Sequence, residues 1–152
     1  MREQRRGRKA AMTSEERDAF LASARTCRVA SLGADGSPHV TPLWFAWDGH
    51  ALWLTSIVKS QRWTDIVRDP RVSIIVDAGV EFTELHGVEL RGKAEVVGEV
   101  PRTGEPVPEL ETPEAIFADK YAGGRMHHDG RHAWLRVTPE KIVSWDFRKA
   151  FG

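Results

Sequence analysis

The stretch from residue 28 to residue 56, "RVASLGADGSPHVTPLWFAWDGHALWLTS", decides the fold. Two Asp-Gly pairs, Asp35-Gly36 and Asp48-Gly49, separate runs that are rich in β-branched and aromatic residues. Asp-Gly between such runs indicates a tight hairpin, because both central turn positions tolerate a positive φ. The stretch therefore predicts a three-stranded antiparallel meander. Its strands are residues 28–33, 38–47 and 51–56.

Pro42 lies inside the middle strand of this meander. Proline cannot donate a hydrogen bond to a β-ladder, so we expect Pro42 at a sheet edge or at a bulge. Further strands are predicted downstream, with Gly92 marking a bulge. They are residues 71–79, residues 83–100 and a final hairpin over residues 132–147 that turns at Thr138–Glu140.

Short helices are predicted between these strands. Thr13 and Glu16 form a capping box that opens a helix to about Arg25. A second helix begins near Ser60 and ends before Pro70, and a third begins at Pro113. Around six antiparallel strands with a few short helices indicate a small, mainly β (α+β) barrel.

The bulk properties describe one ordinary globular domain. The 152 residues suit a single core, and 41% hydrophobic with 29% charged residues is a common balance. The single Cys27 excludes an intrachain disulfide, lies in an apolar stretch typical of a core, and fits a reducing cytoplasm. No apolar run approaches the roughly 18 residues of a membrane span. We therefore predict a cytoplasmic protein.

The N-terminal tail differs in charge from the rest of the chain. Residues 1–11 hold five of the 22 basic residues and one of the 22 acidic residues, which leaves 17 basic and 21 acidic residues, a net charge of −4, for the remainder. We predict that residues 1–12 are a disordered basic tail and that residues 13–152 form a single cofactor-binding barrel domain. A basic arm that contacts nucleic acid is the alternative.

Several common catalytic signatures are absent from the sequence. It has no G-x-G-x-x-G, no Walker-type phosphate loop and no G-x-S-x-G elbow, so hydrolysis by a catalytic triad is disfavoured. The segment "HHDGRH" holds His127, His128, Asp129 and His132, which are residue types that bind transition metals. It reads as a Gly-flanked loop with exposed polar side chains, and we assign no metal site. Most of the six Trp residues are expected in the core, with one or two walling a flat ligand.

A cluster of cations and hydrogen-bond donors opens the second helix. Lys59, Ser60, Gln61 and Arg62 lie there, although a helix N-terminus already carries roughly half a positive charge and disfavours cations. Free backbone N–H groups, a hydroxyl, an amide, an ammonium and a planar guanidinium together suit a phosphate. The cluster predicts an anion site, and a solvated helix start is the alternative.

The order of the motifs resembles a known family. "PHVTPLWF", "LWLTS", "SQRWTDIVRDPRVSIIV" and "LRGKAEVV" follow one another as in the pyridoxamine 5'-phosphate oxidase-like superfamily, including its short flavin- and deazaflavin-dependent members. The resemblance covers about residues 13–149. It implies a six-stranded antiparallel split β-barrel, and a homodimer with the cofactor at the subunit interface.

The resemblance also assigns site residues. The family's phosphate-binding turn corresponds to Ser60, Gln61 and Arg62, with Lys59 adjacent, and its strand-end contacts correspond to Thr55 and Ser56. Its ring-contacting strand corresponds to Val40, Thr41, Pro42 and Leu43. Trp145, Arg148 and Lys149 match its C-terminal region more loosely, and of these we include Trp145 among the cofactor contacts.

The implied function is hydride transfer with FMN or the deazaflavin coenzyme F420, to or from a small conjugated substrate. The flavin-type ring carries that chemistry, so no catalytic side chain is assigned. The terminus "RKAFG" is too short to form the substrate-phosphate segment of pyridoxamine phosphate oxidases, which argues against vitamin B6 oxidation. The alternatives are a non-catalytic carrier of a flavin, a deazaflavin or a haem-like ligand, and a nucleic-acid-binding barrel that uses the basic tail.

Overall fold

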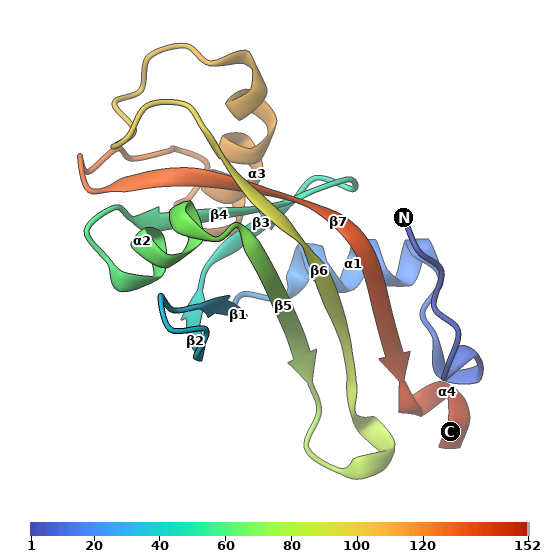
Figure 1. Cartoon of the computed structure of the whole chain (residues 1–152). Coiled ribbons are helices and arrows are strands. Elements are labelled where there is room, and N and C mark those ends of the chain that lie inside the picture. The colour runs from blue at the N-terminus through green and yellow to red at the C-terminus, as the bar shows by residue number, and fades with distance from the viewer. Residues whose placement is uncertain (152) are drawn as a thin grey trace.

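The computed structural model of the chain describes residues 1–151. Its main feature is one curled, antiparallel sheet of seven strands in the order β2-β1-β5-β6-β7-β4-β3 (Figure 1). The curl brings the two ends of the sheet toward each other and makes a half-barrel. The strands are β1 Cys27–Leu32, β2 Pro38–Leu43, β3 Phe45–Trp47, β4 Leu52–Ile57, β5 Arg71–Ala78, β6 His86–Val97 and β7 His132–Asp146.

The mainly β prediction and the meander are confirmed, but the count of six strands is wrong. The strand predicted over residues 38–47 is divided at Trp44 into β2, which pairs with β1, and β3, which pairs with β4. At Trp44 the chain therefore passes from one edge of the curled sheet to the other. Because β2 is an edge strand, Pro42 occupies the kind of position that a residue without an N–H requires.

The predicted C-terminal hairpin is also wrong, because β7 is a single strand of 15 residues. β4 pairs with β7 only as far as Leu52 opposite Val137, so Pro139 has a free edge on that side. On the other side the register between β6 and β7 shifts between Arg91 and Gly92. This places the irregularity at the predicted Gly92, where a Cβ atom would lie 2.5 Å from the Thr138 carbonyl oxygen.

Two of the four α-helices lie in connections between strands, one precedes β1 and one follows β7. The capping box of Thr13 and Glu16 is present with both of its hydrogen bonds and opens α1. The α-helices are α1 Ser14–Ser23, α2 Gln61–Arg68, α3 Glu111–Tyr121 and α4 Phe147–Phe151, and the 3₁₀ turns are η1 Arg8–Ala10, η2 Phe82–Glu84 and η3 Pro108–Leu110. None of the helices within residues 1–151 is long and apolar enough to cross a membrane.

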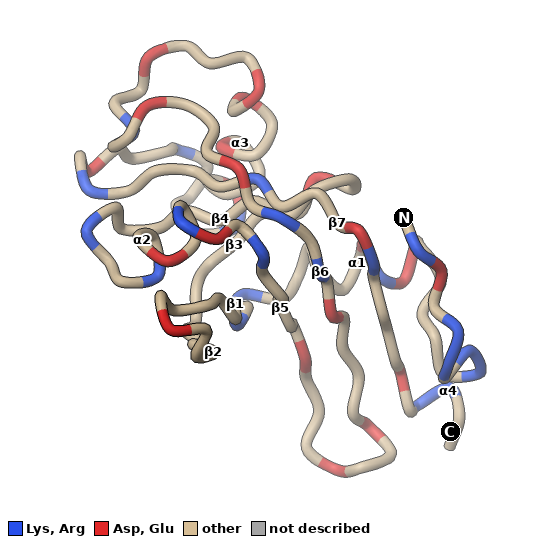
Figure 2. Tube along the Cα trace, viewed as in Figure 1, with Lys and Arg blue, Asp and Glu red and all other residues tan. Residues whose placement is uncertain are grey.

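The basic tail lies along the end of β7. The Gln4 side chain exchanges hydrogen bonds with the backbone of Ser144, and the Ser144 hydroxyl accepts one from the Met12 N–H. Figure 2 shows the Lys and Arg residues of the tail close to those of α4. The predicted disorder of residues 1–12 concerns motion in solution, and it stays a prediction.

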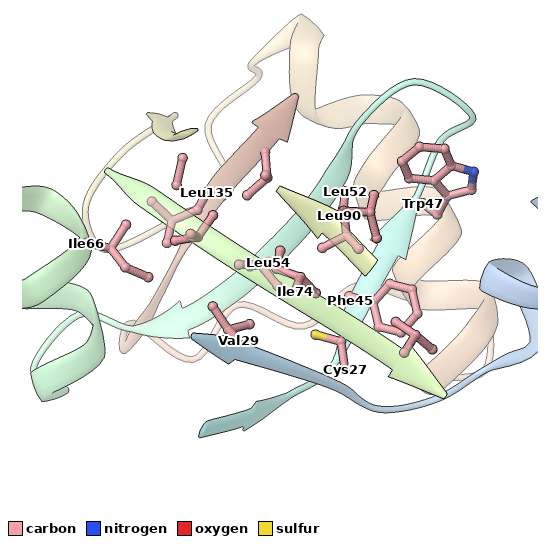
Figure 3. Close-up of a cluster of buried hydrophobic side chains, with 14 of the residues drawn as sticks. Cys27, Val29, Phe45, Trp47, Leu52, Leu54, Ile66, Ile74, Leu90 and Leu135 are labelled. Atoms are coloured by element: carbon pink, nitrogen blue, oxygen red, sulfur yellow. The ribbon is translucent and has the colours of Figure 1, made fainter. Parts of the chain in front are cut away.

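Two apolar clusters lie on the two faces of the curled sheet. The inner cluster fills the half-barrel with side chains from the strands and from α1 and α2, and Figure 3 shows Cys27, Phe45 and Leu90 within it. The outer cluster packs Phe117 of α3 against Trp53 and Trp134. Neighbouring residues of β4 and β7 therefore point to opposite faces, as the period of two in a strand requires. This alternation positions the candidate site.

Candidate functional site

The start of α2 is held by Ser60, which is the N-cap residue. The Ser60 hydroxyl accepts a hydrogen bond from the Trp63 N–H at 3.1 Å and donates one to the Ile57 carbonyl at 2.7 Å. A side-chain acceptor at the N-cap satisfies one of the free donors of the first turn. Ser60 thus fixes the direction in which the first turn of α2 leaves β4.

Arg62 is the centre of the predicted phosphate site. Its Nε donates to the Ser56 hydroxyl at 3.2 Å, and its Nη1 donates to the Thr41 hydroxyl at 2.8 Å. The guanidinium therefore connects α2 to β4 and β2, two strands that four others separate in the sheet order. Three residues that the sequence assigned to one site meet at this point.

The Arg62 guanidinium is half-buried and carries an uncompensated charge. Within residues 1–151 no carboxylate forms an ion pair with it. Burial lowers the pKa of Arg62 from its ordinary value, because desolvation penalises the charged form. A cation in this environment gains stability when an anion arrives.

The other predicted residues of the α2 turn are arranged differently. The Gln61 amide donates to Asp65 at 2.8 Å, so one of its two amide donors is engaged within α2. Lys59 is exposed beside the same turn. On β2, Val40 is exposed and Leu43 is half-buried against the inner cluster. Within residues 1–151 none of these four side chains forms a hydrogen bond with the Arg62 guanidinium.

Within the chain, Trp145 lies away from Arg62 and its hydroxyl partners. Thr55 and Ser56 pair with Trp134 and Ala133 near the start of β7, whereas Trp145 pairs with Gly87 near its end. The 11 residues from Trp134 to Trp145 correspond to about 36 Å along an extended strand. Trp145 is therefore separated from the strand ends at which Ser56 meets Arg62.

A pocket of about 540 Å³ adjoins the predicted ring-binding strand and was not predicted from the sequence. Pro42, Leu43 and Thr55 form part of its wall, so three predicted cofactor contacts line it. Its remaining wall comes from Trp44, next to Leu43 in the chain, and from residues elsewhere in the chain. These residues are Thr26, Trp44, Arg102, Phe117, Met126, His127, His128, Asp129, His132 and Trp134.

Three aromatic side chains, Trp44, Phe117 and Trp134, line this pocket. The Trp44 and Tyr121 rings stack with centroids 4.4 Å apart and an interplanar angle of 6°, and the Phe117 ring meets Trp134 edge-on at 5.5 Å. Trp44 remains 48% exposed at the point where β2 gives way to β3. The expectation that one or two Trp residues wall a ligand site is consistent with this geometry, although no ligand contact tests it.

Four residues of the "HHDGRH" segment line the pocket, namely His127, His128, Asp129 and His132. His132 Nδ1 lies 2.7 Å from Asp129 Oδ2, and Asp129 Oδ1 accepts from the N–H groups of Arg131 and His132. The structure shows no group of three or more His, Cys, Asp or Glu side chains arranged to hold a metal ion among residues 1–151. The Asp-x-x-His spacing was the available sequence signal for the pair, because a tight turn brings such residues together.

A known protein family matches most of this chain. A family model described as pyridoxamine 5'-phosphate oxidase matches residues 13–146. The chain belongs to the pyridoxamine 5'-phosphate oxidase family. The resemblance inferred from the sequence motifs is thereby confirmed over nearly the whole of the predicted barrel domain.

Several solved structures are similar to this family member. A conserved hypothetical protein, Rv2991 from Mycobacterium tuberculosis, is 30% identical over 98% of this chain and 92% of its own, with a TM-score of 0.80. An F420 reductase is 24% identical over 82% and 94%, with a TM-score of 0.61. The haem storage protein HutZ from Vibrio cholerae is 14% identical over 83% and 90%, with a TM-score of 0.66. A search of curated proteins gives no match.

The last two likenesses show the fold alone. The family fold thus occurs in proteins named for a deazaflavin reductase activity and in proteins named for haem storage. For this family member, the choice between these activities has to come from the chemistry of its own residues.

Proposed function

We propose that the chain is an FMN- or F420-dependent oxidoreductase that transfers a hydride to or from a small conjugated substrate. The observation that carries the proposal is Arg62, a half-buried cation that donates to two hydroxyl groups and has no carboxylate partner within residues 1–151. Both cofactors carry a phosphate on the side chain of a tricyclic ring. The site offers that phosphate a charge and donors that the fold itself leaves unused.

The donor set fits such a phosphate. Arg62 and Lys59 would supply positive charge, and Thr41, Ser56 and the first N–H groups of α2 would supply hydrogen bonds. The strand segment from residue 40 to residue 43, together with Thr55, would contact the ring. The bound cofactor supplies hydride chemistry, and the chain supplies binding, orientation and exclusion of water.

A homodimer is part of the proposal. Large apolar side chains are exposed on β2 and at the tip between β5 and β6, where Val40 is 64%, Val80 88% and Phe82 63% exposed. Burying such side chains against a second copy would remove apolar surface from water. A dimer would also give Trp145 a route to the cofactor of the other subunit. Analytical ultracentrifugation is expected to show a dimer, and a monomer at micromolar concentration would contradict this part.

The main test titrates FMN and F420 separately into cofactor-free protein and follows the visible absorption of each. We expect saturable binding of one of them. Arg62→Ala should weaken it by about 2–3 kcal/mol, roughly 30- to 150-fold. Arg68→Ala is the matched control on the same helix, because Arg68 pairs with Asp65 at 2.9 Å. Protein that binds neither cofactor, or equal losses in the two variants, would contradict the proposal.

A non-catalytic carrier of a flavin, a deazaflavin or haem is the second candidate. The pocket lined by Trp44, Phe117 and Trp134, with three His residues also in its wall, favours it. Haem titration tests that ligand through its Soret absorption. Turnover with reduced F420, or with a nicotinamide–flavin couple and conjugated ketones or quinones, separates the candidates. Tight cofactor binding without turnover of any conjugated substrate would favour the carrier.

A further inference from the structure

The basic tail lies against an edge of β7 that no strand covers. β4 pairs with β7 only as far as Val137, so the later residues of β7 have one free edge. Such an edge exposes unpaired N–H and C=O groups. The Arg2 N–H donates to the Glu140 carbonyl at 2.8 Å. The Gln4 side-chain amide bonds both the N–H and the carbonyl of Ser144, each at 3.0 Å. The tail therefore takes the place of the missing strand.

Further contacts give the tail a defined course. Ala10 is buried, and Lys149 of α4 donates to the Ala11 carbonyl at 3.0 Å. Within the tail, Arg8 Nε donates to the Gln4 carbonyl at 3.2 Å. These contacts hold the basic side chains of the tail beside the end of β7.

A second pocket, of about 460 Å³, is lined by the tail and by β7. Its lining residues are Arg2, Glu3, Arg5, Arg8 and Lys141. Four basic residues and one acidic residue give this tail pocket a formal net charge of +3. Its volume lies within the usual range for small-ligand sites, and none of its lining residues is aromatic.

The four cations of the tail pocket are not neutralised within the chain. None of them forms an ion pair with a carboxylate of residues 1–151. The neighbouring cations of α4 differ, because Arg148 pairs with Asp146 at 2.9 Å and Lys149 pairs with Glu16 at 2.8 Å. Figure 2 shows the basic residues of the tail and of α4 close together. The unpaired positive charge is thus concentrated at the tail pocket.

We propose that the tail pocket binds an oligophosphate, an anion made of two or more linked phosphoryl groups. Several cations around one hollow suit an anion with several charges, and the planar arginine forks match phosphate oxygens. A nucleic-acid strand is bound through aromatic faces as well as cations, and the tail pocket has no such face. The phosphoryl chain is therefore the part of the ligand that the pocket recognises.

Binding would also join the tail to the barrel. Arg2, Arg5 and Arg8 come from the tail, whereas Lys141 comes from β7, so one anion would contact both segments. Gln4 is the positioning residue, because its amide fixes the tail on Ser144 without lining the pocket. The ligand should therefore strengthen the docking of the tail.

The first test is isothermal titration calorimetry of tripolyphosphate into the full chain at low salt. Every protein compared carries Arg62→Met, which removes the anion site proposed at α2. We expect one saturable site whose dissociation constant rises with sodium chloride concentration. Orthophosphate should bind about tenfold more weakly or less, because fewer charges meet the cations. No saturable binding of tripolyphosphate would overturn this proposal, while the FMN and F420 titrations of protein with Arg62 intact would still decide the proposed function.

Two double variants with the same change of charge locate the site. Arg5→Gln with Arg8→Gln removes two cations that line the pocket, and Arg6→Gln with Lys9→Gln removes two cations of the tail that do not. Diffuse attraction falls equally in both. We expect the first pair to weaken tripolyphosphate binding at least about tenfold and the second pair less than about twofold. Equal losses would mean diffuse attraction to a basic segment and would overturn the site.

The docking of the tail is tested without a change of charge. Gln4→Ala should weaken tripolyphosphate binding several-fold, because the tail cations lose their fixed position. Lys141→Gln should weaken it several-fold with the tail intact. Tripolyphosphate should also slow tryptic cleavage after Arg6 and Lys9, which lie outside the pocket and so report docking instead of direct shielding. Unchanged affinity in both variants, or unchanged cleavage, would overturn the shared site between tail and β7.

The source of the phosphoryl chain is tested by exchanging the ligand. Tripolyphosphate and adenosine triphosphate should bind with affinities within about threefold of each other, because the pocket offers a base no aromatic face. A single-stranded oligothymidylate should bind more weakly than tripolyphosphate. Binding of adenosine triphosphate more than about tenfold tighter would mean that the base is recognised. Tighter binding of the oligothymidylate would assign the tail to nucleic acid, and either result would overturn the proposal.

Discussion

Arg62 is half-buried and Arg102 is buried, and the two arginines differ in their surroundings. Arg102 forms a bidentate pair with Glu114 at 2.9 and 3.0 Å, and it also bonds Glu99 and the carbonyl of Glu105. Arg62 contacts only two hydroxyl groups by recorded hydrogen bonds within residues 1–151. The Glu114 carboxylate raises the pKa of Arg102, whereas burial lowers the pKa of Arg62.

The difference separates a structural role from a binding role. Arg102 joins the segment after β6 to α3, and Glu114 also accepts from Trp134 Nε1 at 2.9 Å, so this network fixes α3 over the outer cluster. Its charges are satisfied within the chain. Arg62 crosses the gap between β2 and β4 with its charge uncompensated. The protein pairs the buried Arg102 fully with carboxylates. The unpaired charge of Arg62 at the start of α2 therefore indicates a binding role.

The largest effect is expected for Arg102→Met. The substitution keeps most of the side-chain volume but leaves the Glu114 carboxylate without its partner, and removal of one partner of a buried pair costs about 3–5 kcal/mol. Urea denaturation should show this loss in the free energy of unfolding. Adding Glu114→Gln to Arg102→Met should recover part of it. A loss below about 1 kcal/mol would show that the network is not structural.

The second effect distinguishes Arg62 by its response to an anion. Inorganic phosphate at ten times its dissociation constant should raise the free energy of unfolding of the wild type by about 1.4 kcal/mol. Arg62→Met should show no such gain, and its stability without phosphate should lie within about 0.5 kcal/mol of the wild type. Sodium chloride at matched ionic strength controls for screening. Equal stabilisation of both proteins would remove Arg62 from the anion site.

The Arg62 group was predictable because its signals are local. Ser60 and Arg62 follow β4 directly in the chain, and cations at a helix start conflict with the helix dipole, so a short window of sequence carries the chemistry. The family resemblance then added Thr41 from a strand 21 residues away. The direct contact between Thr41 and Arg62 agrees with that assignment, while cofactor binding itself stays a prediction.

The pocket and the strand count were not predictable for the opposite reason. The pocket wall joins Trp44, Phe117 and Trp134, which come from three segments that meet only in the folded chain. Trp44 divides a strand because the sheet curls, and Pro139 lies within β7 because the β4 ladder has ended at Val137. Local propensity predicts neither the division of the strand at Trp44 nor the position of Pro139 within β7, because pairing between distant segments decides both.

Lys120 tests whether every unpaired, half-buried cation marks an anion site. Its Nζ lies 3.9 Å from the centroid of the Phe45 ring and donates to the Leu21 carbonyl at 3.1 Å, and burial lowers its pKa to about 8. A ring face and a carbonyl oxygen already stabilise this ammonium. We therefore expect phosphate to stabilise Lys120→Met as much as the wild type.

The pH dependence of Lys120 has a definite sign. Between about pH 8 and the ordinary lysine value of 10.5, the unfolded chain binds more protons at this residue than the folded chain does. Stability contributed by this residue therefore rises with pH in that range. The free energy of unfolding of the wild type minus that of Lys120→Met should increase by about 1 kcal/mol, because solvent screening reduces the effect at a half-exposed group. A constant difference would contradict the buried-ammonium interpretation.

The smallest effect is expected for Thr41→Val. The substitution preserves shape and removes the hydroxyl that accepts from Arg62 Nη1 at 2.8 Å. A hydrogen bond of this kind contributes about 0.5–1.5 kcal/mol, so phosphate affinity should fall about two- to tenfold. If Thr41 acts by holding the guanidinium across the gap between β2 and β4, Thr41→Val should have no further effect in the Arg62→Met background. Additive losses in that double-mutant cycle would instead mean that Thr41 contacts the anion independently of Arg62. In that case Ser56 would be the hydroxyl that positions the Arg62 guanidinium.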